Sequence, residues 1–158
     1  MYKFFLDITI KTGYNMLTTI SKGREIMKCG FIGHRDSVGI EREIYVCISE
    51  LMKKGVNEFY SGGMGNFDKM CERTVKKLNG KIIFVPYNTK QVKLIDKLWY
   101  DDIVYPFSNK EYSKYDIPNR NKWLVDNSDV LICHVYKNGG AKNTLIYAEK
   151  KNKKIFYI

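Results

Sequence analysis

The stretch Lys28-Cys29-Gly30-Phe31-Ile32-Gly33-His34-Arg35 decides the fold, because it joins an apolar, strand-like run to a glycine turn. The same order recurs at Glu58-Phe59-Tyr60-Ser61-Gly62-Gly63-Met64-Gly65, and again where Val130-Leu131-Ile132-Cys133 leads to Asn138-Gly139-Gly140. Each turn is followed by a helix-like stretch. In a parallel α/β sheet such turns lie together at the carboxyl edge, where helix N-termini and glycine amides donate hydrogen bonds to anions. The repetition therefore predicts a phosphate-bearing ligand at that edge.

From Met27 onward, strand-like and helix-like segments alternate along the chain. Strands are expected at 28–32, 56–60, 81–86, 129–135 and 154–158, with a short one at 103–105. Helices are expected at 38–54, 67–78, 90–98, 119–127 and 142–151, and a tyrosine-rich loop at 106–118. This order predicts an α/β, Rossmann-like fold: a three-layer α/β/α arrangement around a mainly parallel sheet of about five strands.

Residues 1–26 do not share this alternation. We therefore expect an N-terminal arm at 1–26 and a nucleotide-binding domain at 27–158. Met27 stands directly before the first core strand, which favours it as the natural start, and the alternative is an arm that packs on the domain.

The chain of 158 residues carries a formal net charge of +10. Such a charge attracts polyanions through long-range electrostatics. The lysines are spread over many predicted helices, however, which favours solvated helix surfaces over a nucleic-acid footprint. Nucleic acid is therefore the less favoured partner.

The cysteines and histidines limit the chemistry further. No two of the four cysteines have the Cys-x-x-Cys spacing, so we expect reduced thiols and a cytoplasmic location. They are Cys29, Cys47, Cys71 and Cys133. With only two histidines available, no metal site is expected. The sequence also lacks an apolar run long enough to span a bilayer, so no membrane partner is expected.

The first two turns supply the strongest candidate ligand contacts. Gly33, His34 and Arg35 follow the first strand, and the arginine can pair with phosphate oxygens through two parallel hydrogen bonds. His34 could instead be a turn residue that bonds its own loop. In the second turn, Ser61, Gly62, Gly63 and Gly65 favour close approach of the backbone to a ligand. Asp68 comes just inside the next helix, where it either caps the helix or binds a ribose hydroxyl.

Two later segments add candidates at the same edge. Gly139, Gly140 and Thr144 repeat the glycine-turn arrangement after a later strand. Arg120 and Asn121 lie at the start of a predicted helix and could reach the shared edge. The alternative for Arg120 is a solvated side chain on the helix surface.

Four motifs in this order resemble the SLOG superfamily, which unites the DNA-processing protein DprA with the LOG phosphoribohydrolases. They are Phe31-Ile32-Gly33-His34-Arg35, Ser61-Gly62-Gly63-Met64-Gly65-Asn66-Phe67-Asp68, the segment from Arg120-Asn121 to Asp129-Val130-Leu131-Ile132, and Gly139-Gly140-Ala141-Lys142-Asn143-Thr144 with Ala148. The resemblance covers about residues 28 to 158 and is closest to small, single-domain bacterial and phage members. It implies a pocket for a nucleotide or nucleotide derivative, formed by the glycine turns.

The chain departs from the LOG pattern Pro-Gly-Gly-x-Gly-Thr-x-x-Glu. No proline precedes Gly139, no third glycine follows Gly140, and Tyr147 stands where the pattern has its glutamate. Glu149 lies two residues later, on a different face of the helix. The resemblance therefore implies binding more strongly than hydrolysis.

Three functions follow, in this order of preference. The first is binding of a nucleotide-derived small molecule in signalling, stress or phage defence, with no other cofactor identified. The second is an enzyme acting on an N-glycosidic bond, with Asp68 or Glu72 as the working carboxylate. The third is DprA-like binding of single-stranded nucleic acid, with bases stacked on Tyr105, Phe107, Tyr112 and Tyr115, although these aromatics could equally pack on the sheet. Homo-oligomerisation stays open.

Overall fold

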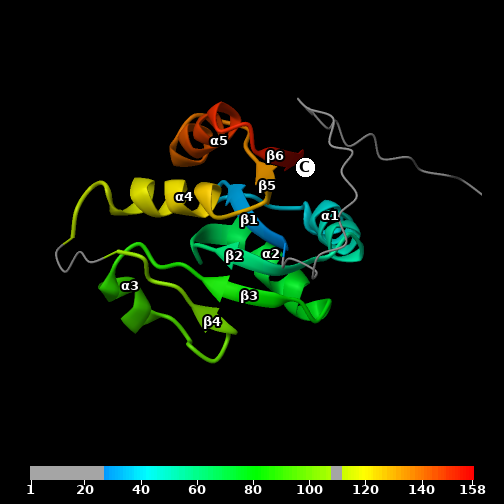
Figure 1. The fold of residues 1–158 in the computed structure, drawn as a ribbon, viewed down its shortest axis with the longest axis horizontal. Helices are drawn as coiled ribbons and strands as arrows, with labels where there is room; N and C mark the ends of the chain where they lie inside the picture. Colours follow the sequence, from blue (N-terminus) through cyan, green and yellow to red (C-terminus); the bar gives the residue numbers. More distant parts are fainter. Residues whose placement is uncertain (1–26, 108–111) are drawn as a thin grey trace, which may run out of the picture.

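The computed structural model describes residues 27–107 and 112–158, which form one parallel sheet with helices on both faces (Figure 1). The strands are β1 (Met27–Gly33), β2 (Val56–Ser61), β3 (Lys81–Phe84), β4 (Asp102–Ile103), β5 (Val130–His134) and β6 (Lys154–Tyr157). The helices are α1 (Glu41–Lys53), α2 (Gly65–Lys77), α3 (Thr89–Leu94), α4 (Asp116–Asp126) and α5 (Gly140–Lys150). The predicted α/β, Rossmann-like class is confirmed, with six strands where about five were expected.

Side-chain alternation along the strands divides the core between the two faces. On β5, Val130 and Ile132 join the apolar cluster under α1 and α2, whereas Leu131 and Cys133 join the cluster under α4 and α5. Strand residues alternate in this way because successive side chains point to opposite faces. Helix α1 packs against α2 and α4 against α5, and Figure 1 shows the latter pair together on one side of the sheet.

The strand order β4-β3-β2-β1-β5-β6 creates a switch point between β1 and β5. From β1 the chain winds outward through β2, β3 and β4, and it then returns to the other side of β1 as β5. Every neighbouring pair is parallel. In open sheets of this kind, ligands bind outside the carboxyl ends of the strands at the switch point.

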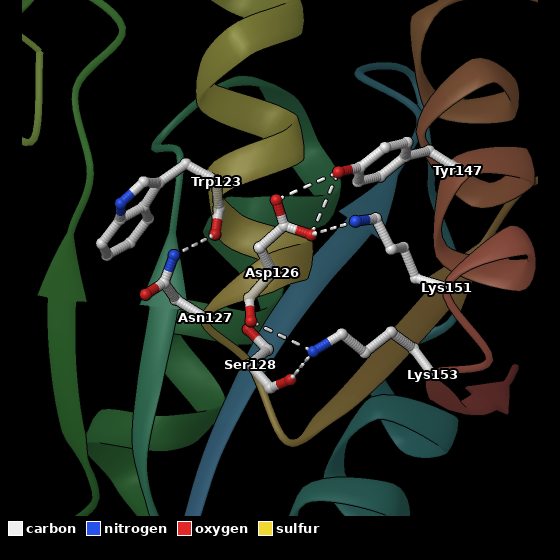
Figure 2. Close-up of polar contacts among 7 residues, drawn as sticks. All are labelled: Trp123, Asp126, Asn127, Ser128, Tyr147, Lys151 and Lys153. Atoms are coloured by element: carbon white, nitrogen blue, oxygen red, sulfur yellow. Dashed lines mark hydrogen bonds and ion pairs between the residues drawn. The ribbon is translucent and has the colours of Figure 1, made fainter.

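Polar contacts fix the wall formed by α4 and α5. Asp126, at the end of α4, accepts hydrogen bonds from the Tyr147 hydroxyl at 3.0 and 3.1 Å and lies 3.9 Å from Lys151 Nζ (Figure 2). Lys153 Nζ donates to the main-chain carbonyls of Asp126 and Ser128 at 3.1 and 2.9 Å. A cation at a helix C-terminus stabilises carbonyls that have no partner within the helix.

Two predicted segments were placed incorrectly. The helix expected at 90–98 ends at Leu94, because Ile95 adopts an extended conformation with ψ of 152°. The loop expected at 106–118 gives way to α4 at Asp116. Pro118 is tolerated there because it stands in the first turn, where a main-chain N–H has no helical acceptor. The expectations about residues 1–26 lie outside the described residues.

All four cysteines are buried, free thiols. Burial raises the pKa of Cys29 and Cys71 well above the usual range and that of Cys47 to about 11. Among the described helices, none has the length and apolar character needed to cross a membrane.

Candidate functional site

A cleft of about 520 Å³ opens at the switch point, between the segments that follow β1 and β5. Most of the predicted site residues line it: Gly33, His34, Arg35, Gly62, Asp68, Arg120, Asn121, Gly140 and Thr144. Four other predicted residues, Ser61, Gly63, Gly65 and Gly139, are each adjacent in the chain to a residue that lines the cleft but do not line it themselves. A volume of this size falls in the range of small-molecule and nucleotide sites.

Arg120 lies at the inner end of the cleft and is only 3% exposed. Its Nη1 donates to the carbonyls of Gly62 at 2.9 Å and Val85 at 3.0 Å, and its Nε donates to Asn121 Oδ1 at 2.9 Å. Burial lowers the pKa of Arg120 to about 10. Arg120 thus lies at the predicted edge of the sheet, and the alternative of a solvated side chain is wrong. Its guanidinium also ties the ends of β2 and β3 to α4.

A second guanidinium, that of the exposed Arg35, lies on the same cleft. Its Nη2 lies 3.9 Å from the sulfur of Met64, and Nη2 of Arg120 lies 3.3 Å from that sulfur. Within residues 27–107 and 112–158, neither arginine forms an ion pair with a carboxylate. Two arginine charges therefore converge on a thioether, which is a weak acceptor.

The N-terminus of α5 adds main-chain donors to the cleft. Its N-cap residue is Gly139, with φ of 139°, and no side chain of the described residues caps it. A Cβ on Gly140 would meet nothing within 4 Å, so the backbone is open to close approach there. An uncapped helix N-terminus carries partial positive charge and free N–H groups, and both favour an anion.

Asn121 and Thr144 connect the two helices that border the cleft. Asn121 Nδ2 donates to Thr144 Oγ1 at 3.1 Å, and that hydroxyl donates to the carbonyl of Gly140 at 2.8 Å. Because Asn121 also accepts from Arg120, a continuous hydrogen-bonded path runs from the inner guanidinium to the start of α5. These contacts hold both walls in place.

The glycines of the first two turns are explained by protein packing. A Cβ on Gly33 would lie 2.2 Å from the Phe67 ring, and one on Gly62 would lie 2.2 Å from Arg120 Nη1. At Gly63, with φ of 63°, a Cβ would meet the Phe84 ring at 2.7 Å. Gly65, with φ of 88°, packs in the same way against the Arg35 backbone. The close approach predicted for the glycines of the second turn is therefore made by the protein itself, because a Cβ at each of them would clash with neighbouring protein atoms.

The two carboxylates predicted as catalytic candidates, Asp68 and Glu72, are both buried but differ in position. Asp68 lines the cleft and accepts from the main-chain N–H of Met64, the N-cap residue of α2, at 2.9 Å, although no side-chain cap forms at that helix N-terminus. Burial raises the pKa of Asp68 to about 7, against the opposing effects of this hydrogen bond and of Arg120.

Glu72 lies away from the cleft. It accepts from Ser61 Oγ at 2.6 Å, Trp99 Nε1 at 3.0 Å and the Tyr100 hydroxyl at 3.1 Å. Three donors fix it as an anchor for residues 99–100, with no opening to the cleft.

Sequence reasoning missed a latch between the β1–α1 and β5–α5 loops, formed by His34, Asp36, Tyr136 and Lys137. Asp36 accepts from the Tyr136 hydroxyl at 2.6 Å and pairs with Lys137 Nζ, and these bonds lower its pKa to about 2. The main-chain N–H of Lys137 donates to His34 Nε2 at 3.3 Å, so the expected turn role of His34 extends to the second loop. No signal in the sequence pairs residues 101 positions apart.

Known proteins resemble this chain in structure alone. No protein-family model matches it, and the search of curated proteins found no match. DNA processing protein A (DprA) from Streptococcus pneumoniae superposes with a TM-score of 0.68 at 15% identity, over 84% of this chain and 50% of that one. DprA from Helicobacter pylori, studied for its single-stranded DNA binding mode, gives 0.65 at 21% identity, over 83% and 64%.

A third neighbour is the molybdenum cofactor carrier protein of Chlamydomonas reinhardtii, with a TM-score of 0.58 at 14% identity, over 84% of this chain and 76% of that one. The chain thus spans about half the length of the S. pneumoniae DprA structure. The fold implied by the SLOG motifs, that of DprA, is confirmed.

Proposed function

We propose that this chain, built on the Rossmann-like fold of the SLOG proteins, binds a nucleotide or nucleotide-derived small molecule in the switch-point cleft. One observation carries the proposal: two guanidiniums that form no ion pair among the described residues share a cleft with an uncapped helix N-terminus. Charge-assisted hydrogen bonds to phosphate are roughly twice as strong as neutral ones, and Arg35 is exposed and available to form them.

The test is affinity for a panel of nucleotides, measured by calorimetry. Arg35→Ala should weaken binding by about 1.5–3 kcal/mol, or roughly 10- to 150-fold, because a charged contact is lost from a partly enclosed site. Arg42→Ala is the matched control, since Arg42 is exposed on α1 and does not line the cleft. Equal affinities for all three proteins, or no binding of any nucleotide, would refute the proposal.

A second candidate, single-stranded nucleic-acid binding, is favoured by exposed aromatics. Tyr112 and Tyr115 are 65% and 58% exposed, and Lys114 Nζ lies 5.0 Å from the centre of the Tyr115 ring. Such rings can stack bases while lysines neutralise phosphates. This candidate rests on Tyr112 and Tyr115 more than on Tyr105 and Phe107, whose ring centres lie 6.0 Å apart in an edge-to-face arrangement.

Salt dependence separates the two candidates. Binding to an oligonucleotide would weaken steeply as salt rises, because condensed counterions are released. It would also weaken in Tyr112→Ala/Tyr115→Ala while surviving Arg35→Ala. If the cleft proposal is correct, mononucleotide binding should weaken in Arg35→Ala and survive in Tyr112→Ala/Tyr115→Ala.

A further inference from the structure

The position of the Met64 side chain is unusual for an arginine-rich site. Its sulfur lies 3.3 Å from Nη2 of Arg120 and 3.9 Å from Nη2 of Arg35. The other donors of Arg120 are directed to oxygen: Nη1 to two carbonyls and Nε to a side-chain amide. Nη2 is thus the one arm of the buried guanidinium whose contact is to sulfur.

A thioether is a poor partner for this arm. Sulfur of methionine is a weak acceptor with no formal charge, whereas a phosphate or carboxylate oxygen forms short, charge-assisted bonds to guanidinium. Arg120 is nearly fully desolvated, and Asp68, whose pKa burial raises to about 7, compensates its positive charge only in part. Replacing the sulfur by an anionic oxygen would improve both contacts at once.

Met64 can also move without disturbing the fold. Its side chain is half-buried and unbranched, with three rotatable bonds. Its main-chain N–H is held by Asp68, and it lies between Gly63 and Gly65, whose positive φ values shape the turn. The backbone therefore stays in place while the thioether swings away.

We propose that the Met64 sulfur holds the place of an anionic ligand oxygen, and that a phosphoryl group displaces it and bridges Arg35 and Arg120. This inference rests on the proposed function and names the group that the site recognises. A neutral nucleoside would leave Met64 in place, since it offers no anionic oxygen to the two guanidiniums.

Methionine methyl NMR on the full chain tests the displacement directly, with inorganic phosphate as the probe. The protein is labelled with ¹³C-methyl methionine, and the Met64 signal is assigned by its absence in Met64→Leu. Phosphate should shift the Met64 methyl signal and leave those of Met52 and Met70, which lie in or against the core under α1 and α2, unchanged.

Affinity gives the second readout. Met64→Ala should bind phosphate about two- to tenfold more tightly, because two weak sulfur contacts, together worth about one ordinary hydrogen bond, no longer compete. Met52→Ala is the matched control and should leave phosphate affinity unchanged. Circular dichroism checks that each variant folds, and the wild-type NMR titration does not depend on any variant's stability.

The outcomes separate this inference from the proposed function. If a nucleotide binds while the Met64 methyl stays still in the phosphate titration and Met64→Ala binds phosphate no more tightly, the displacement is wrong and the proposed function stands. If neither phosphate nor any nucleotide binds, both are wrong.

Discussion

Gly62→Ala should destabilise the fold through Arg120. A Cβ at Gly62 would lie 2.2 Å from Nη1, 2.4 Å from Cζ and 2.7 Å from Nη2 of that side chain. Arginine ends are usually flexible, but this one is 3% exposed and bonded to Gly62 and Val85 carbonyls. The guanidinium must therefore leave its position.

The magnitude follows from the bonds that are lost. Two hydrogen bonds from a charged donor are worth about 1.5–3 kcal/mol each, and relocation of the guanidinium toward water recovers part of this. We expect the free energy of unfolding to fall by about 3–5 kcal/mol, a large share of the stability of an ordinary domain. Urea unfolding followed by circular dichroism measures it, with Gly140→Ala as the control because its Cβ enters open space.

A double-mutant cycle isolates the cause. In an Arg120→Ala background the steric conflict is absent, and φ of Gly62 lies outside the left-handed region, so Gly62→Ala should then cost less than about 1 kcal/mol. An equal loss in both backgrounds would show that Gly62 is required for another reason and would refute this account.

Two further predictions concern Asp68 and Gly63. Burial raises the pKa of Asp68 to about 7, so the carboxyl loses its proton as pH rises through 7 and then offsets the charge of Arg120. Affinity for sulfate, which does not titrate here, should therefore fall from pH 6 to pH 8 in the wild type and stay flat in Asp68→Asn; a flat wild-type profile by calorimetry would contradict this. Gly63→Ala should lower the midpoint of urea unfolding by straining a residue with φ of 63° and crowding Phe84, and a midpoint equal to the wild type would show that the turn adapts.

The location of the candidate site at the carboxyl edge of the sheet could be predicted from sequence, because strand, glycine turn and helix follow one another locally. Gly33, Gly62 and Gly140 all signal close approach, but only the fold shows whether protein or open space lies beside them. The partners of Arg120 come from carbonyls 58 and 35 residues away, which no local pattern encodes. For the same reason the pairing of Asp36 with Lys137 could not be foreseen.

The burial of all four thiols affects how fast the protein is oxidised. Two of them lie in the sheet, on β1 and β5, and two lie in the helical layer formed by α1 and α2. Because burial raises their pKa values, little of the reactive thiolate is present in the native state. Oxidation of these thiols therefore requires that the structure first opens. Irreversible thiol oxidation of this chain would then proceed at a rate set by unfolding, and a ligand bound in the cleft would slow it by stabilising the folded state.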